Sequence, residues 1–469
     1  PERISGREGS TTVHQLAQFI KIASVVVFAL IFLWILVLFL KQTKTIARLS
    51  PFRIHWPYVQ GKKINPPKEL LRKRWYSKTY FEKLFSKITT RQGKRLFFSI
   101  FASVLFTRLS LLLLGYLGYI LRNNESPGII YSLRIIWEKW DSSHYLWIAQ
   151  NWYTNVGEER LFIVFFPLYP LMIRFFNFLL QDYFVSGLVV SLVSLTVACF
   201  YLYKLVEIDY PASVAQRCIR WVLIFPYTFF LSLVFTESLF LALSVLSFYA
   251  MRHKRWILAG FFGLLASLTR NFGFFLFIPL FIEYAISTDF FKNLRARRYR
   301  EIAATFWQVA IGLGLIALGF FLYLLLNKWI TGDWFRFLNY LREHWHQSFG
   351  FFAENIQNQF TMALTWKPID RLALWIPQLS VLLFSIVTIL VSLRTMRLSY
   401  VAYMFTLVFV SFSATWLLSA PRYTTTMFPI YIFLARISEN EIFDWILTFF
   451  SLTMLCVYAL AYTWGAYVM

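Results

Sequence analysis

The chain of 469 residues is 58% hydrophobic and 20% aromatic, and only 15% of its residues are charged. Globular domains are about 45–50% apolar and about 25% charged, so this composition excludes an ordinary soluble protein. Uncharged stretches repeatedly approach the roughly 20 residues that a helix needs to cross a bilayer. We therefore predict an all-α, polytopic integral membrane protein.

The net charge of +23 comes from 46 Lys and Arg against 23 Asp and Glu, a balance that would suggest a nucleic-acid partner in a soluble protein. Here the basic residues cluster between hydrophobic runs, and sixteen of them lie within residues 41–95. Basic residues concentrated in loops between spans mark the cytoplasmic side of a membrane. We predict no nucleic-acid partner, and membrane lipids are the expected surroundings.

Hydropathy and the basic loops predict about twelve membrane crossings, with the N-terminus outside. The first crossing, 17–40, and the basic segment after it are predicted to form an extra N-terminal region, 1–95, ahead of a membrane domain at 96–469. The other predicted crossings are 96–121, 184–206, 218–236, 238–251, 256–269, 272–288, 303–326, 372–393, 398–418, 424–436 and 444–464.

Two segments on the predicted outer face differ from clean spans. Residues 132–152 have a helical spacing of Ile, Trp and Tyr, which favours an interfacial amphipathic helix in an outer loop. Residues 163–180 contain Pro167, Pro170 and an arginine, a pattern typical of a re-entrant or broken helix that lines a cavity. A second outer loop is predicted at 327–371.

Four predicted spans are too short for a bilayer, and each carries a charged residue at its outer end. These residues lie 13 to 15 positions from the nearest cytoplasmic charge. At 1.5 Å per helical residue this is about 20 Å, short of a hydrocarbon thickness of about 30 Å. The four residues predicted to share one level are Arg108, Glu237, Arg270 and Arg422.

Ionisable groups at that depth are costly unless they face a wet cavity or pair with each other. Three arginines against one glutamate leave surplus positive charge, which an anionic ligand would neutralise, and the guanidinium fork suits phosphate. Within a membrane, a lipid phosphate is the natural ligand. The alternative is that Glu237 pairs with one arginine simply to hold helices together.

The first outer loop contains WEKWDSSHY, in which Asp141 and His144 are three residues apart and so share a helix face beside Trp140. Aromatic rings next to a carboxylate favour sugar binding, with Asp141 taking a hydroxyl proton. The alternatives are an interfacial aromatic belt, a capping role for Asp141 and a plain interfacial position for His144. A metal on Asp141, His144 and Glu138 would lack the dense ligand spacing of known sites, so we predict no cofactor, without excluding a metal.

Six sequence blocks follow one another over residues 96–469: WEKWDSSHYLWIAQNWY, VFFPLYPLMIR, FPYTFFLSLVFTESLFL, LASLTRNFG, GDWFRF and SAPRYTTTMFPIYIFLA. Together, and in this order, they resemble the second mannosyltransferase of GPI-anchor assembly and its prokaryotic relatives (PIG-V type), within the GT-C class of membrane glycosyltransferases. Two features depart from that family: Asn271 stands where it often has proline, and residues 1–95 lie outside the resemblance.

The resemblance implies a GT-C fold with an outer-loop active site, a polyprenyl- or dolichyl-phosphate-linked sugar as donor, a lipid or glycan hydroxyl as acceptor, and inversion at the anomeric carbon. Asp141 would match the catalytic acidic residue and act as general base, while Arg270 and Arg422 would hold the donor phosphate. Mannose follows from the resemblance alone. The remaining predicted substrate-binding residues are Trp140, His144, Glu237, Tyr423 and Arg108.

A transporter or flippase of an anionic lipid or glycolipid is the alternative function, because an arginine-lined chamber within the membrane would also serve transport. The sequence contains no visible inverted repeat, which counts against it. Short outer loops and the lack of a retention signal favour a prokaryotic plasma membrane with the active site on its extracytoplasmic face. The endoplasmic reticulum membrane is the alternative location.

Overall fold

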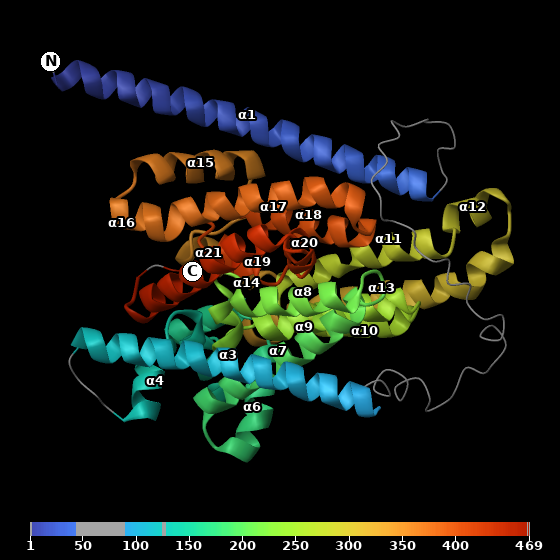
Figure 1. Cartoon of the computed structure of the whole chain (residues 1–469), viewed down its shortest axis with the longest axis horizontal. Coiled ribbons are helices and arrows are strands. Elements are labelled where there is room, and N and C mark those ends of the chain that lie inside the picture. The colour runs from blue at the N-terminus through green and yellow to red at the C-terminus, as the bar shows by residue number, and fades with distance from the viewer. Residues whose placement is uncertain (1, 44–89, 124–127, 467, 469) are drawn as a thin grey trace.

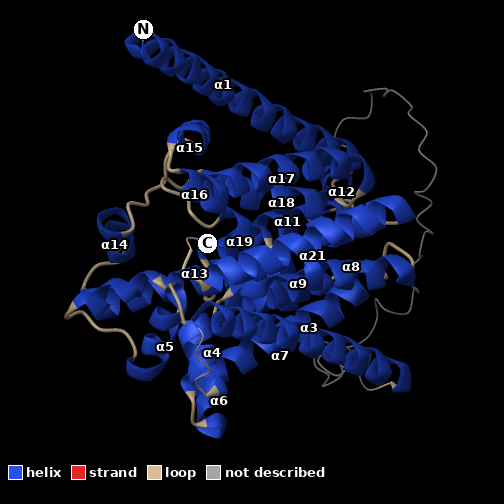
Figure 2. Cartoon of the chain, turned by 60° about the vertical axis from the view of Figure 1, so that its left-hand side comes forward, coloured by secondary structure: helices blue, strands red, loops and turns tan. Residues whose placement is uncertain are grey.

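The computed structural model describes residues 2–43, 90–123, 128–466 and 468, and helices dominate this part of the chain (Figures 1 and 2). No strand forms within these ranges, where one isolated antiparallel bridge joins Phe349 and Ala414. The all-α prediction is confirmed for the described residues. Most of the predicted basic segment, at 44–89, lies outside them.

The helices differ widely in length. In chain order they are α1 (Glu2–Gln42), α3 (Arg91–Asn123), α4 (Ile129–Trp137), α5 (Asp141–Asn151), η2 (Glu158–Val164), α6 (Leu168–Leu180), α7 (Tyr183–Val206), α8 (Ala212–Ile224), η3 (Thr228–Ser232), α9 (Glu237–Arg252), α10 (Trp256–Ser267), η4 (Asn271–Leu276), α11 (Phe277–Ser287), α12 (Phe290–Arg295), α13 (Tyr299–Thr331), α14 (Arg336–His344), α15 (Phe352–Thr365), α16 (Pro368–Asp370), η5 (Arg371–Trp375), α17 (Ile376–Thr395), α18 (Leu398–Phe412), α19 (Ala420–Thr424), α20 (Pro429–Ile437) and α21 (Glu441–Thr463).

Six helical segments among the described residues are long and apolar enough to cross a membrane, and a bent pair would make seven. They contain α1, α3, α7, α13, α17 and α21. A multi-pass membrane protein is therefore supported, whereas the predicted count of twelve crossings is not confirmed. The difference arises because apolar helices such as α10 and α18 have only 10–17 residues, fewer than the roughly 20 that cross a bilayer.

The bent pair is η2 with α6, whose axes differ by 108° across a short break. Pro167 caps the start of α6 and Pro170 lies in its first turn. Proline has no backbone N–H to donate, so it is tolerated at a helix start but interrupts a continuous helix. The predicted broken helix in this segment is confirmed.

The single amphipathic helix predicted over 132–152 is wrong, because the chain breaks there into α4 and α5. Between them Trp140 adopts a positive φ of 57°, a backbone region that bulky side chains rarely occupy. Neither glycine nor proline marks this break in the sequence. As a consequence, Asp141 is the first residue of α5 instead of a mid-helix residue.

Helix α9 lies at the centre of the bundle and packs against α7 and α10 (Figure 1). Every residue from Glu237 to Met251 is buried. In contrast, α1 lies on the outside along α15, where Phe28 contacts Phe352 at 4.8 Å between ring centroids. Because α9 is enclosed, the charged residues at its two ends must find partners inside the protein.

Candidate functional site

Asp141 begins α5, where a carboxylate interacts favourably with the helix dipole. Its Oδ2 accepts a hydrogen bond from Arg422 Nη1 at 2.8 Å. The side chain retains 24% of its exposure, and Oδ1 makes no hydrogen bond to any residue that the structure describes. Asp141 therefore presents one anchored oxygen and one open oxygen.

Arg422 of α19 also approaches Glu237, the first residue of α9. Its Nε lies 3.1 Å from Glu237 Oε1, at ion-pair distance but outside hydrogen-bond alignment. The same Oε1 accepts a hydrogen bond from Arg270 Nη1, which donates to Thr236 Oγ1 at 3.0 Å as well. Asp141, Arg422, Glu237 and Arg270 thus form one continuous ion-pair network, which we name the Asp141 cluster.

The Asp141 cluster contains two carboxylates and two guanidinium groups, so its formal charge is zero. The predicted surplus of positive charge is therefore wrong, because Asp141 joins the arginines and Arg108 does not. A phosphate would not be drawn in by net charge here. It would be held by guanidinium N–H groups that the cluster leaves unused.

Arg108 lies elsewhere, although it was predicted at the same level. Its guanidinium donates to the carbonyl oxygens of Thr228 at 2.6 Å and Leu223 at 2.5 Å, and to Ser232 Oγ at 3.1 Å. These contacts fix the turn around η3. The predicted grouping of Arg108 with the other three charged residues does not hold, and its placement is that of a structural arginine.

Tyr423 connects the two arginines of the Asp141 cluster. The guanidinium carbon of Arg270 lies 4.7 Å from the centroid of the Tyr423 ring, and that of Arg422 lies 5.5 Å from it. Arg422 is also 5.2 Å from the ring of Phe235. Cation–π contacts of this kind contribute about 0.5–2 kcal/mol each and fix the orientation of the guanidinium planes.

His144 packs among aromatic rings instead of joining the ion pairs. Its ring centroid lies 4.5 Å from that of Phe162 and 5.1 Å from that of Phe165. Phe165 in turn contacts Trp345 of the second outer loop at 6.0 Å. Burial lowers the pKa of His144, and this effect exceeds the rise caused by the nearby Asp141 carboxylate. His144 is therefore a half-buried neighbour of the Asp141 cluster that contacts aromatic residues linked to the second predicted outer loop.

The backbone ahead of Asp141 is clamped to the C-terminal end of α21. Lys139 Nζ donates to the carbonyl oxygen of Thr463 at 2.5 Å. In the opposite direction, the Tyr462 hydroxyl donates to the carbonyl oxygen of Lys139 at 3.3 Å. The clamp holds Trp140, whose positive φ costs on the order of 1–3 kcal/mol. Sequence reasoning missed these contacts because Lys139 and Tyr462 are 323 positions apart.

Trp137 supports the same backbone segment through contacts with α21 and α3. Its indole stacks on Tyr462 with ring centroids 5.8 Å apart and rests on Gly115 of α3. A Cβ atom at Gly115 would lie 2.3 Å from Trp137 Cζ2, so only glycine leaves room for the ring. Gly115, one of two glycines in the predicted span 96–121, was the one local sequence signal for this contact.

The second predicted outer loop is hydrogen-bonded to the segment that leads into α19. Gly350 N donates to Ser413 O at 2.7 Å, and Thr415 N donates to Ser348 O at 2.9 Å. This pairing ties residues of the predicted GDWFRF loop region to the chain a few positions before Arg422. Both predicted outer loops therefore lie near the Asp141 cluster: the first contains Asp141, and the second is bonded to the chain ahead of Arg422.

The described part of the chain contains no group of three or more His, Cys, Asp or Glu side chains placed to hold a metal ion. Asp141, His144 and Glu138, which were considered as a ligand set, therefore do not form one. The expectation that no cofactor is needed stays a prediction.

Comparison with known proteins gives a partial match to a curated relative. No family model matches the chain. A segment of 166 residues, 33% of the chain, is 30% identical to the protein named GPI mannosyltransferase 2 from Schizosaccharomyces pombe. The match spans about one third of that relative, 34% of its length. This similarity supports a distant relationship between the chain and that mannosyltransferase family.

Proposed function

We propose that the protein is an integral-membrane glycosyltransferase that moves mannose, or another hexose, from a polyprenyl- or dolichyl-phosphate sugar to a hydroxyl acceptor. The observation that carries this proposal is the Asp141 carboxylate, anchored to Arg422 through one oxygen and open at the other. The partial similarity to a GPI mannosyltransferase supports the same reaction class.

In the proposed reaction Asp141 Oδ1 accepts the proton of the acceptor hydroxyl. The acceptor oxygen forms a bond to the anomeric carbon of the sugar from the face opposite the phosphate. The bond between the anomeric carbon and the phosphate oxygen breaks, and its electron pair stays on the departing lipid phosphate. The configuration at the anomeric carbon is therefore inverted.

Arg422 and Arg270 are proposed to stabilise the charge that develops on the leaving phosphate. Both guanidinium groups are held by Glu237 and by the Tyr423 ring before any substrate binds. Donors fixed in advance are effective, because they need not reorganise as charge moves. Arg422 also binds Asp141, so the base and the phosphate site share one side chain. Trp140 and His144 are proposed to line the sugar side of this centre.

The proposed location is a prokaryotic plasma membrane with the reaction on its extracytoplasmic face, and the endoplasmic reticulum membrane is the alternative. A transporter or flippase of an anionic glycolipid would use the same arginines but would not need an open carboxylate oxygen. The two functions therefore differ in whether purified protein in detergent, where transport has no meaning, turns over a sugar donor.

The test is transfer of radiolabelled mannose from polyprenyl-phosphate-mannose to extracted membrane lipids by the purified protein. Wild type is compared with Asp141→Asn and with Asp370→Asn, a matched change in α16 far from the cluster in sequence. We expect Asp141→Asn to lose about 10²–10⁴-fold in rate and Asp370→Asn to retain wild-type activity. Full activity in Asp141→Asn would refute the assigned base. If wild type transfers neither mannose nor another polyprenyl-phosphate sugar, the transferase proposal fails in favour of transport.

A further inference from the structure

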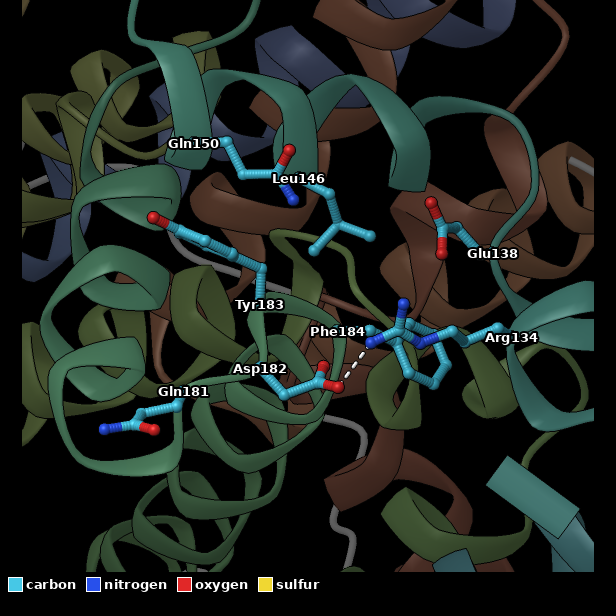
Figure 3. A pocket seen from close by; sticks show the side chains of 8 residues that line it. All are labelled: Arg134, Glu138, Leu146, Gln150, Gln181, Asp182, Tyr183 and Phe184. Atoms are coloured by element: carbon cyan, nitrogen blue, oxygen red, sulfur yellow. Dashed lines mark hydrogen bonds and ion pairs between the residues drawn. The ribbon is translucent and has the colours of Figure 1, made fainter. Parts of the chain in front are cut away.

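A second polar pocket lies between α4, α5 and the start of α7, and Figure 3 shows the side chains that line it. Its volume is about 180 Å³. Gln150 of α5 faces it, nine positions after Asp141, which at 100° per residue is about half a turn around the helix. The polar residues that line the pocket are Arg134, Glu138, Gln150, Gln181, Asp182 and Tyr183.

One wall of the pocket is fixed by an ion pair. Arg134 donates to Asp182 Oδ2, as Figure 3 shows, and Asp182 Oδ1 accepts a hydrogen bond from Val185 N at 3.0 Å, which caps α7. The Arg134 guanidinium also lies 5.8 Å from the Phe184 ring. Arg134 and Asp182 cancel each other's charge and join α4 to the start of α7.

The other polar groups of the pocket make no internal contacts. The half-buried carboxylate of Glu138 and the solvent-exposed amides of Gln150 and Gln181 have no hydrogen bond or ion pair to any residue in the described ranges. Burial raises the pKa of Glu138, an effect larger than the lowering by Arg134. A partly buried carboxylate without a protein donor gains from a ligand that supplies one.

The chemistry of these groups selects a class of ligand. With Arg134 and Asp182 paired, Glu138 gives the pocket a negative charge, which disfavours a phosphate. A carboxylate and two amides offer acceptors and donors side by side, and a sugar hydroxyl is both donor and acceptor. The Tyr183 ring supplies a flat apolar face for a sugar ring. The volume is below the roughly 300–1,000 Å³ of drug-sized sites, which suits one sugar unit.

We propose that this pocket binds one uncharged hexose of the acceptor glycan, next to the hexose whose hydroxyl is presented to Asp141. The proposal rests on the proposed transferase function. Glu138 lies three positions before Asp141, the first residue of α5, so the proposed path of the acceptor runs over this end of the helix. The pocket would then select acceptors with at least two sugar rings.

Binding of octyl α-mannobioside to the full-length protein in lipid nanodiscs tests the proposal without any transfer reaction. Saturation-transfer NMR and titration would compare wild type with Glu138→Ala, Gln150→Ala and Gln92→Ala, the last a matched exposed glutamine at the start of α3. We expect about tenfold weaker binding in both pocket variants, wild-type binding in Gln92→Ala, and retained binding in Asp141→Asn. Equal affinity in all variants, or no binding to wild type, would overturn the pocket assignment.

Steady-state kinetics separate this proposal from the transferase proposal. With the disaccharide acceptor, the pocket variants should raise KM about tenfold and leave kcat unchanged, whereas octyl α-mannopyranoside should show no difference. Weaker binding in the variants of a protein without transferase activity would keep the pocket and reject the function. Transfer activity with an unchanged KM in the pocket variants would keep the transferase function and reject the pocket. Free ethanolamine provides a counter-test. If it competes with the disaccharide for the pocket and Glu138→Gln abolishes this competition, the pocket binds an ammonium group and the sugar assignment is wrong.

Discussion

Two clusters of two acids and two arginines lie at opposite ends of α9. Glu237, the first residue of α9, belongs to the Asp141 cluster, and Arg252, the last residue, belongs to a second one. The second cluster, which we name the Glu283 cluster, consists of Asp209, Arg252, Glu283 and Arg397. The two have the same formal composition, so charge alone does not distinguish them.

They differ in how fully their polar atoms are hydrogen-bonded. In the Glu283 cluster both oxygens of Glu283 are used: Arg397 donates to them at 2.5 and 3.2 Å, and Ser399 donates at 2.8 Å. Arg252 donates twice to Asp209 and also to the Tyr400 hydroxyl at 3.1 Å. Such saturation is what a structural ion pair requires inside a protein.

The Asp141 cluster is left incomplete. Glu237 Oε2 is buried without a hydrogen-bond partner, Arg422 Nε is misaligned, and Asp141 Oδ1 is open among the residues described. Unsatisfied buried polar atoms are costly and rare in folded proteins. The comparison teaches that incomplete bonding, and not the presence of charge, separates a candidate reaction centre from a structural one.

The largest expected effect that tests this comparison is on stability. Glu283 is 2% exposed and binds two arginines, so Glu283→Gln leaves Arg397 without its ion-pair partner and Arg252 with Asp209 alone. Removing one partner of a buried pair costs about 3–5 kcal/mol. Thermal denaturation of the purified variant should show a clearly lower Tm, with the activity per folded molecule unchanged.

The matched control is Glu439→Gln, which breaks the exposed pair between Arg217 and Glu439. Exposed pairs contribute about 0–1 kcal/mol, so this variant should keep a Tm close to wild type. If Glu283→Gln instead abolished transfer in well-folded protein, the Glu283 cluster would have a catalytic role, and the distinction between the clusters would fail.

The second prediction exchanges arginine for lysine in each cluster. Arg422→Lys keeps a positive charge but loses the planar fork that reaches Asp141 and Glu237 together. We expect a loss of about 10²–10³-fold in kcat, the effect of removing one fixed donor from a developing negative charge. Arg397→Lys in the Glu283 cluster should lower Tm and leave kcat unchanged. Equal kinetic loss in both variants would contradict the assignment.

Part of this arrangement is predictable from sequence. Counting helical residues from the basic borders placed Glu237, Arg270 and Arg422 at one level, and the three side chains do meet. The count gives depth along a helix but not the direction in which a side chain points. The count gives Arg108 the same predicted level, but its side chain faces the carbonyl oxygens around η3 and does not join the other three.

Other features have no local sequence signal. The break before Asp141 falls in a stretch without glycine or proline. Distant contacts hold it instead, since Tyr462 and Thr463 of α21 bind Lys139. The predicted number of spans is not confirmed for a related reason. Hydropathy shows that α10 and α18 are apolar, but it does not show whether a short apolar helix crosses the membrane alone or fills the bundle.

The third prediction asks whether this distant support positions Asp141. In Gly115→Ala the new Cβ would displace the Trp137 ring, and a shift of about 1 Å at a reacting group can cost up to 10²-fold. We expect kcat to fall about tenfold. Gly314→Ala on α13, where a Cβ meets no atom within 4 Å, is the control. Adding Trp137→Phe should restore activity, and a loss of Tm without a kinetic effect would refute the positioning role.

The smallest expected effect concerns His144, the titratable neighbour of the Asp141 cluster. Burial lowers its pKa below the ordinary value of 6.5, while Asp141 raises it and His344 lowers it further. The unfolded chain therefore binds a proton at a higher pH than the folded protein does. Stability should fall as the pH drops through 6.5 towards the folded pKa. His144→Gln should remove this slope, whereas His14→Gln on the exposed face of α1 should keep it.

The Tm of each variant, measured from about pH 7.5 to about pH 5.5 across the ordinary range of histidine titration, checks this prediction. The same experiment in Asp141→Asn sharpens the comparison between the clusters. Without the carboxylate that raises the pKa of His144, burial and His344 remain, so the slope should become steeper. An unchanged slope would mean that the Asp141 charge is fully compensated by Arg422. The open oxygen of Asp141 would then have no net electrostatic effect on His144. In that case the Asp141 cluster would resemble the saturated Glu283 cluster.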